Sequence, residues 1–307
     1  MFNLIARRAL LALPIVWGVS FVTFMLIHLL PGDPVLVMLS ASNPTPRQIA
    51  EVRQQLHLDE PLPQQYIGYV ARVLRGDLGE SVFDQRPVLD EILEVLPSTI
   101  ELAVAAVAIG AFLGLVLGTL GALSEGRWLG SLIGTLSLVG VSMPSFWLGF
   151  LLIFAFALRL GWLPATGQGG LARLILPAAT LGLGFAAITT RLVRQSMVEI
   201  LRTGYIRTAW AKGLTQRVVI VRHALTNALI PVITVVGVQL GNLLAGTIIV
   251  ETVFSRQGIG RLAVIAILDR DFPLVQGVVL VSALGYVLVN LVVDLAYLVV
   301  DPRTRVA

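Results

Sequence analysis

Groups that could make, break or transfer a bond are scarce in this sequence. It contains no cysteine, which excludes disulfides, thiol nucleophiles and metal sites held by thiolates. Its only lysine, Lys212, follows Ala211, whereas a P-loop needs Gly-Lys followed by Ser or Thr. A nucleotide site of that type therefore cannot form within this chain.

The histidines are equally poor candidates for catalysis. His28, His57 and His223 are far apart in the sequence, and none has a partner at the spacing of a metal site. The triplet Gly140-Val-Ser142 has the letters of an intramembrane serine nucleophile, but no histidine is placed to act as its base. We predict no catalytic residue, no metal and no cofactor bound by this chain.

Basic residues, in contrast, are regularly spaced between Arg191 and Ala228. Five of them recur at every fifth position, namely Arg202, Arg207, Lys212, Arg217 and Arg222. Near a bilayer centre each costs about 2.5–3.5 kcal/mol, so this segment cannot cross the membrane. Gly213 predicts a break between two short helices, about Arg194–Ala211 and Thr215–Ala224. Binding a cytoplasmic protein is the function that best suits such a segment.

The elements that position this segment are apolar helices. Of the 307 residues, 56% are hydrophobic and 13% are charged, against about 25% charged in soluble domains. A span needs about 20 apolar residues. Six stretches qualify: roughly Ala9–Leu30, Ile100–Leu123, Ile133–Leu158, Ile175–Thr190, Leu229–Val250 and Val275–Val300. The predicted fold class is therefore an all-α integral membrane protein with six transmembrane helices.

Two features of these spans predict how the helices pack. Gly110, Gly114 and Gly118 repeat at a spacing of four, which is typical of a face where helix backbones approach closely. Pro144 removes a backbone hydrogen bond inside the third span. It predicts either a hinge or a tolerated bend.

The distribution of arginine and lysine predicts which side each loop occupies. With the N-terminus inside, the inner segments hold twelve basic residues and the short outer loops hold five. An excess of basic residues marks the cytoplasmic side. Both termini are therefore expected in the cytoplasm.

The long loop between the first two spans is expected to form a small helical subdomain outside the membrane. Thr45, Pro46 and Gln48 predict a capped helix start. A second helix is expected over Gln64–Arg75, with Ile67, Val70 and Leu74 facing inward and Gly76 ending it. The loop is acidic, so it is either an ordinary solvated surface or a docking surface for an outside partner.

These segments divide the chain into four parts. They are a cytoplasmic N-terminus with the first span (1–30), the outside subdomain (31–98), a five-helix core that includes the cytoplasmic segment 191–228 (99–300), and a cytoplasmic tail (301–307).

Several motifs resemble those of one transporter family. The stretch from Tyr205 to Gly213 and the stretch from Arg222 to Pro231 resemble the coupling motif of binding-protein-dependent ABC import permeases. Further likeness to the dipeptide, oligopeptide and nickel branch, in its B-type subunit, lies in Leu30-Pro-Gly-Asp-Pro34, Arg75-Gly-Asp-Leu-Gly79, Glu251-Thr-Val-Phe254, Gly258-Ile-Gly-Arg261 and Asp301-Pro-Arg303. The sequence departs from the superfamily motif at Arg207 and Thr208, where Glu and Ala are usual, and at Thr226, where Pro is usual.

The resemblance implies a non-catalytic transport subunit of a bacterial or archaeal plasma membrane. Expected partners are a second, homologous permease in a heterodimer, two ABC ATPase subunits that bind ATP and Mg²⁺ on the cytoplasmic side, an outside solute-binding protein and the lipid bilayer. Nucleic acid is not expected. The expected ATPase-coupling residues are Tyr205, Arg207, Ala209, Trp210, Lys212, Gly213 and Leu225. Of these, Tyr205, Ala209 and Trp210 are expected to supply an apolar anchor.

The substrate is expected to be a dipeptide or oligopeptide, with glutathione, nickel chelates and oligosaccharides as open alternatives. Gln239, Asn242 and Asn290 are the candidate residues of its path. An ion-coupled secondary transporter is the alternative function, because such carriers place ionisable groups in the membrane. Asp294 is the main candidate for that role, although it lies near the inner interface.

Overall fold

The computed structural model describes residues 2–29, 33–39, 45–55, 58–229, 232 and 247–300. The chain divides into two compact units, one formed by Met1–Thr99 with Gln257–Leu288 and the other by Ile100–Arg256 with Val289–Ala307. Over the described residues the elements are helices, and the extended structure is limited to an isolated bridge between Glu80 and Pro87. The predicted all-α fold class is confirmed.

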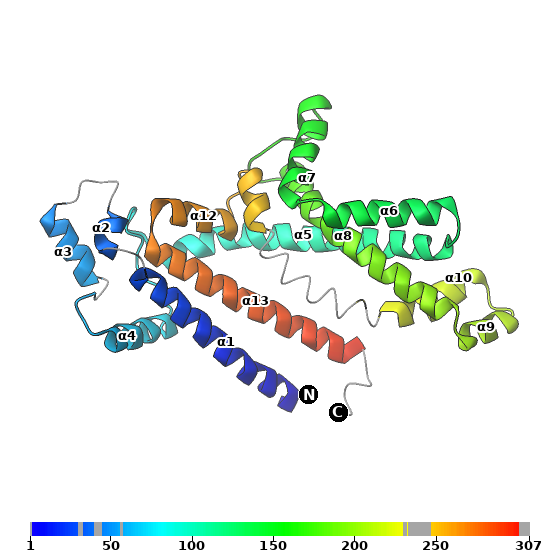
Figure 1. The fold of residues 1–307 in the computed structure, drawn as a ribbon, viewed down its shortest axis with the longest axis horizontal. Helices are drawn as coiled ribbons and strands as arrows, with labels where there is room; N and C mark the ends of the chain where they lie inside the picture. The colour runs from blue at the N-terminus through cyan, green and yellow to red at the C-terminus, as the bar shows by residue number, and fades with distance from the viewer. Residues whose placement is uncertain are drawn as a thin grey trace. The chain divides into compact units, whose positions relative to one another are not determined.

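The first unit combines membrane helices with the small helical subdomain that follows α1. Its helices are α1 (Phe2–His28), α2 (Pro34–Met38), α3 (Pro46–Gln55), α4 (Leu62–Leu74), α12 (Ile259–Asp269), the start of α5 (Val88–Leu123) and most of α13 (Phe272–Val300). Figure 1 shows α1 and α13 side by side, and the Gln276 amide donates to the Thr23 carbonyl at 3.0 Å. This buried bond ties the first membrane helix to the last.

Asp271 joins three parts of the first unit. Its carboxylate accepts hydrogen bonds from the Ser81 hydroxyl at 2.5 Å, the Val82 amide at 3.1 Å and the Leu274 amide at 3.2 Å. The last bond caps the start of α13, and the other two fix the loop that precedes α5. The acidic side chain is therefore a structural tether.

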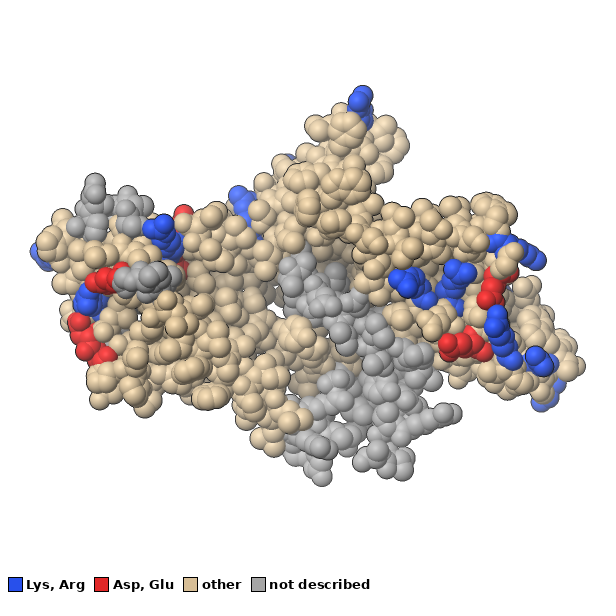
Figure 2. All heavy atoms as spheres, viewed as in Figure 1, with Lys and Arg blue, Asp and Glu red and all other residues tan. Residues whose placement is uncertain are grey.

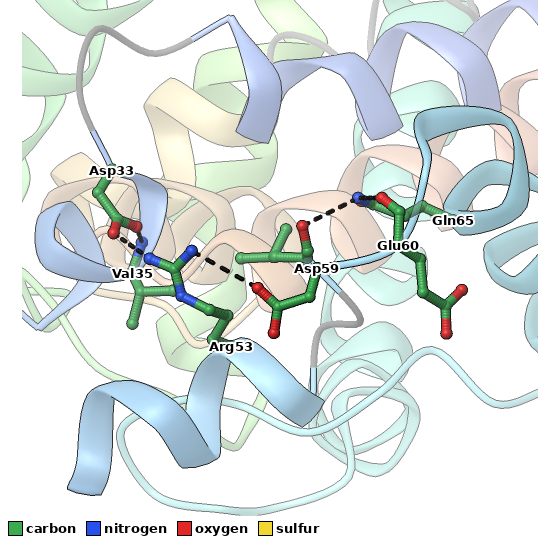
Figure 3. Close-up of polar contacts among 7 residues, drawn as sticks. Asp33, Val35, Arg53, Asp59, Glu60 and Gln65 are labelled. Carbon is green, nitrogen blue, oxygen red and sulfur yellow. Dashed lines mark hydrogen bonds and ion pairs between the residues drawn. The ribbon is translucent and has the colours of Figure 1, made fainter. Parts of the chain in front are cut away.

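The start of α3 agrees with its prediction. The Thr45 amide donates to the Gln48 side chain at 2.9 Å, and the Gln48 amide donates to the Thr45 hydroxyl at 3.3 Å. This is the reciprocal capping box. Near the end of α3, Arg53 forms ion pairs with Asp33 and Asp59 (Figure 3). It thereby links α3 to the segments before α2 and α4.

The predicted inward face of α4 is wrong. Ile67 and Leu74 are exposed, whereas Gln65 and Tyr69 are buried. The reason is that polar and aromatic side chains supply this interface. The rings of Tyr66 and Tyr69 lie tilted against Phe24 of α1, and Gln65 Oε1 is hydrogen-bonded to His28 Nε2 of α1 at 2.9 Å. The Gln65 amide also donates to the Glu60 carbonyl at 2.7 Å (Figure 3).

The second unit is built around α8 (Leu171–Leu201). It also contains the main part of α5, the end of α13, and the helices α6 (Trp128–Ser142), α7 (Ser145–Leu152), η1 (Ile153–Arg159), α9 (Gly204–Ala211), α10 (Gln216–Val218) and η2 (Val219–Leu225). Four helices of the described chain are long and apolar enough to cross a membrane, and the pair α6 and α7–η1 makes a fifth if its bent halves form one span. Most of the predicted fifth span, Leu229–Val250, lies outside the described residues.

The predicted glycine face packs α5 directly on α8. A Cβ atom added at Gly110, Gly114 or Gly118 would lie 2.2–2.6 Å from side-chain atoms of Phe185, Thr189 and Val193, which also repeat at a spacing of four. Real Cβ atoms do not approach this closely, so only glycine allows the observed backbone separation. The predicted packing face is confirmed.

Two predicted helices differ from the structure in the second unit. The bend at Pro144 is 109°, larger than the predicted kink, because Met143 before the proline has an extended, non-helical backbone that interrupts the helix. The predicted helix Arg194–Ala211 is also wrong, because α8 continues to Leu201 and Thr203 is extended before α9 begins.

Candidate coupling surface

The segment from Gly204 to Leu225 is held against the end of α8 by an apolar core. Ile206 and Ala209, three residues apart on α9, are buried against Val193 and Met197 of α8. Burying an aliphatic side chain of this size contributes about 1.5–3 kcal/mol. α9 is therefore attached firmly to the membrane helix that precedes it.

The returning half of the segment packs into the same core. Val219, Ile220 and Ala224 of η2 are buried, and the Ser196 hydroxyl of α8 donates to the Ala228 carbonyl at 3.0 Å. The π-helical η2 is a type of turn that occurs often at functional sites. Both halves of the segment are thus fixed to α8.

Tyr205 joins the two halves by hydrogen bonds. Its hydroxyl donates to the His223 carbonyl at 3.1 Å, and the Asn227 amide donates to the Tyr205 hydroxyl at 3.2 Å. The ring remains exposed. Tyr205 therefore both closes the segment and contributes to its outer surface.

Gly213 makes the turn between the halves, as the sequence predicted. Its φ of +76° lies in the left-handed region, which other residues adopt only with strain. Its amide donates to the Trp210 carbonyl at 2.9 Å, which ends α9. No atom lies within 4 Å of the position of an added Cβ, so conformation rather than crowding requires glycine here.

The outer face of the segment combines apolar and basic side chains. Trp210, Leu214, Val218 and Val221 are exposed apolar residues. Arg207, Lys212, Arg217 and Arg222 are exposed around them. Figure 2 shows basic side chains gathered at the end of the second unit formed by α8, α9 and α10. Such an apolar patch with a charged rim is typical of a protein interface. We call these eight residues with Tyr205 the coupling surface.

The predicted site residues fall into three groups. Tyr205, Arg207, Trp210, Lys212 and Gly213 are exposed in the segment, whereas Ala209 is buried and Leu225 packs partly buried against the same core. Ile206 was not predicted from the sequence; it is fully buried and attaches α9 to α8. Its spacing of three from Ala209 was the available signal.

The candidate substrate-path residues are not brought together by the described structure. Asn290 is half-buried in α13, while Gln239 and Asn242 lie outside the described residues. The side chain of Asp294 also lies outside them.

Family comparison decides the class of the protein. Residues 110–306 match the family of binding-protein-dependent transport system inner membrane components, and residues 1–103 match the N-terminal domain of such membrane components. The chain belongs to this permease family. Permeases of this family are non-catalytic transport subunits of ABC importers, which work with ATPase and binding-protein partners in the inner membrane.

Curated relatives resemble the permease over almost its whole length. A di/tripeptide transport system permease of Pseudomonas aeruginosa is 42% identical, with 99% of both chains covered. A glutathione transport system permease of Escherichia coli is 41% identical over 99% of both chains. A dipeptide transport system permease of Alkalihalophilus pseudofirmus is 42% identical over 97% of this chain and 98% of the relative.

Solved structures share the fold at lower identity. The MetNI methionine ABC transporter matches with a TM-score of 0.60 and 18% identity, covering 69% of this chain and 96% of that chain. An amino acid ABC transporter matches with a TM-score of 0.52 and 17% identity, covering 70% of this chain and 94% of that chain. Both likenesses support the importer permease fold.

Proposed function

We propose that this permease forms half of a translocation pathway for small peptides, delivered from outside by a solute-binding protein. The second half would come from a homologous permease in a heterodimer. The three curated relatives described above carry the names of di/tripeptide, glutathione and dipeptide transport systems, which supports a peptide substrate. The positive-inside distribution supports cytoplasmic termini.

The observation that carries this proposal is the coupling surface on its fixed base. Two ATPase subunits would each seat one permease's segment, so that Trp210, Leu214 and Val218 enter an apolar cleft and the basic rim meets carboxylates. ATP and Mg²⁺ would bind to those partners, since this chain lacks a P-loop lysine. Because Ile206 and Ala209 pack on α8, movement of the segment would be transmitted directly to a membrane helix.

Composition of the purified complex is the first test. Affinity purification of the tagged permease from membranes should recover a second permease, two ATPase chains and a binding protein. Proteoliposomes of that complex should then accumulate labelled dipeptide only with ATP, with glutathione, a nickel chelate and an oligosaccharide as competing substrates. Uptake by the permease alone, driven by a proton gradient and lost in Asp294→Asn, would support the secondary carrier instead.

Replacing the turn residue tests the coupling role. Gly213→Asp should leave the protein inserted but abolish ATP-driven uptake, because the turn of the coupling surface would be distorted. Gly161→Asp is the matched control, since Gly161 also has a positive φ and open surroundings but lies outside the segment. Each substitution should cost about 1–2 kcal/mol of conformational energy. Substrate-stimulated ATP hydrolysis retained in Gly213→Asp would contradict the proposed coupling.

A further inference from the structure

A second polar site lies beside α8, apart from the coupling surface. A pocket of about 340 Å³ lies between α8, α6 and the end of α5, and two arginines and two glutamates are among its lining residues: Glu125, Gly134, Arg191, Arg194, Gln195, Val198 and Glu199. All of these residues belong to the second unit. In the topology proposed above, the pocket lies at the cytoplasmic boundary of the membrane, because Arg191 directly follows the apolar stretch that ends at Thr190.

Two glycines create the space for the Arg194 side chain. A Cβ atom on Gly134 would lie 2.5 Å from Arg194 Nη1, and one on Gly121 would lie 3.2 Å from Arg194 Cδ. Larger residues at these positions would push the guanidinium out of the pocket. The neighbouring helices α5 and α6 are thus shaped around this basic group.

The two glutamates of the pocket are bound to residues other than its two arginines. The Glu125 carboxylate is bound by Arg202 at 3.1 Å, and the Glu199 carboxylate accepts a hydrogen bond from Gln195 at 3.4 Å. Neither Arg191 nor Arg194 forms an ion pair with any described residue. Two adjacent guanidinium groups at a membrane boundary favour an anion with several oxygens, and phosphate offers the matching geometry.

A second, mostly apolar pocket lies farther along α6. Gly134, Leu138 and Ser142 repeat at a spacing of four, so they follow one face of the helix over roughly 12 Å. Leu138 and Ser142 line this pocket of about 510 Å³, together with Pro144 at the bend and Trp147 in α7. At the opposite end of α6, Trp128 is 76% exposed, as is typical of a residue at the membrane interface.

We propose that the two pockets together bind one anionic phospholipid. Arg191 and Arg194 would hold its phosphate, and an acyl chain would follow the face of α6 from Leu138 toward Trp147. Basic pockets between membrane helices on the cytoplasmic side suit such headgroups. A lipid fits better than a soluble anion because Leu138 of the apolar pocket lies one helical turn along α6 from Gly134 of the basic pocket.

Lipid retention by the purified complex tests the proposal. Native mass spectrometry should be performed on the full importer complex titrated with palmitoyl-oleoyl phosphatidylglycerol or with the matching phosphatidylcholine. The double variant Arg191→Gln, Arg194→Gln should weaken phosphatidylglycerol binding by about tenfold or more and leave phosphatidylcholine binding unchanged. Arg127→Gln, which removes an exposed arginine outside the pocket, should change binding less than about twofold.

Further arms distinguish the occupant of the pocket. The double variant Arg191→Lys, Arg194→Lys should retain most of the phosphatidylglycerol binding, because it keeps both positive charges. Equal retention of the two lipids by the wild type would overturn the proposal. Displacement of the lipid by millimolar inorganic phosphate would assign the pocket to a free anion. If the Arg191→Gln, Arg194→Gln variant loses the ATPase subunits but retains phosphatidylglycerol as the wild type does, the pocket would be assigned to a protein contact. Lipid binding is measured without transport, so the proposed lipid site can be tested even if the proposed peptide substrate is wrong.

Discussion

Adding one methyl group at Gly114 should separate α5 from α8. The new Cβ would lie 2.5 Å from Thr189 Cβ and 2.6 Å from Thr189 Cγ2. Favourable carbon contacts are about 3.5–4.0 Å, so the overlap is about 1 Å and the β carbon cannot rotate away. Overpacking of this kind costs about 1–3 kcal/mol.

The matched control is Gly184→Ala on α8, where an added Cβ meets no atom within 4 Å. Both substitutions gain about 0.8–1 kcal/mol of helix propensity, so their difference isolates the overpacking cost. We expect Gly114→Ala to be less stable than Gly184→Ala by about 1–3 kcal/mol in the free energy of unfolding. Reversible denaturation in mixed micelles measures both values.

A double-mutant cycle with Thr189→Gly extends this test. Removing the Thr189 side chain should offset most of the Gly114→Ala cost, giving a coupling energy of about 1–3 kcal/mol. If Gly114→Ala stabilises the protein as much as Gly184→Ala does, the close approach of α5 and α8 is refuted.

Two further predictions concern other parts of the chain. Ile206→Ala should lower the free energy of unfolding by about 2–5 kcal/mol and should also lower the substrate-stimulated ATPase activity. Ile267→Ala, at an exposed site, should change neither quantity. Equal stability of the two variants in thermal denaturation would contradict the role of Ile206 in attaching α9 to α8. Burial raises the pKa of Glu91 to about 7, and the neighbouring Asp84 carboxylate adds to the shift. Glu91 precedes the apolar part of α5. In the folded protein its carboxyl group keeps its proton up to a higher pH than in the unfolded chain. The contribution of Glu91 to stability should therefore be greatest in acid and decline as the pH rises to about 7. Glu91→Gln should flatten the dependence of the melting temperature on pH between about pH 5 and pH 8, and a slope equal to that of the wild type would speak against this assignment.

Local patterns predicted the parts of the fold that depend on local physics. The apolar stretches, the capping box at Thr45 and the turn at Gly213 each follow from a few adjacent residues. The glycine face was equally predictable, because its spacing of four leaves few alternatives to close packing.

Features that depend on tertiary partners were not predictable in the same way. The buried face of α4 holds Gln65 and Tyr69 because α1 offers aromatic and polar partners, which a hydrophobic pattern does not register. The proline at 144 predicted a bend, but its size of 109° depends on the extended residue before it. In the candidate site, composition identified the segment but could not distinguish the buried Ala209 from the exposed Trp210.

The uninterrupted length of α8 has a mechanical consequence. It runs for 31 residues, about 46 Å, and the apolar core at its end clamps both halves of the coupling segment. A lever of this length converts a rotation of about 10° at one end into a displacement of about 8 Å at the other. Small rearrangements at the base of the helix are therefore amplified across the whole thickness of a bilayer.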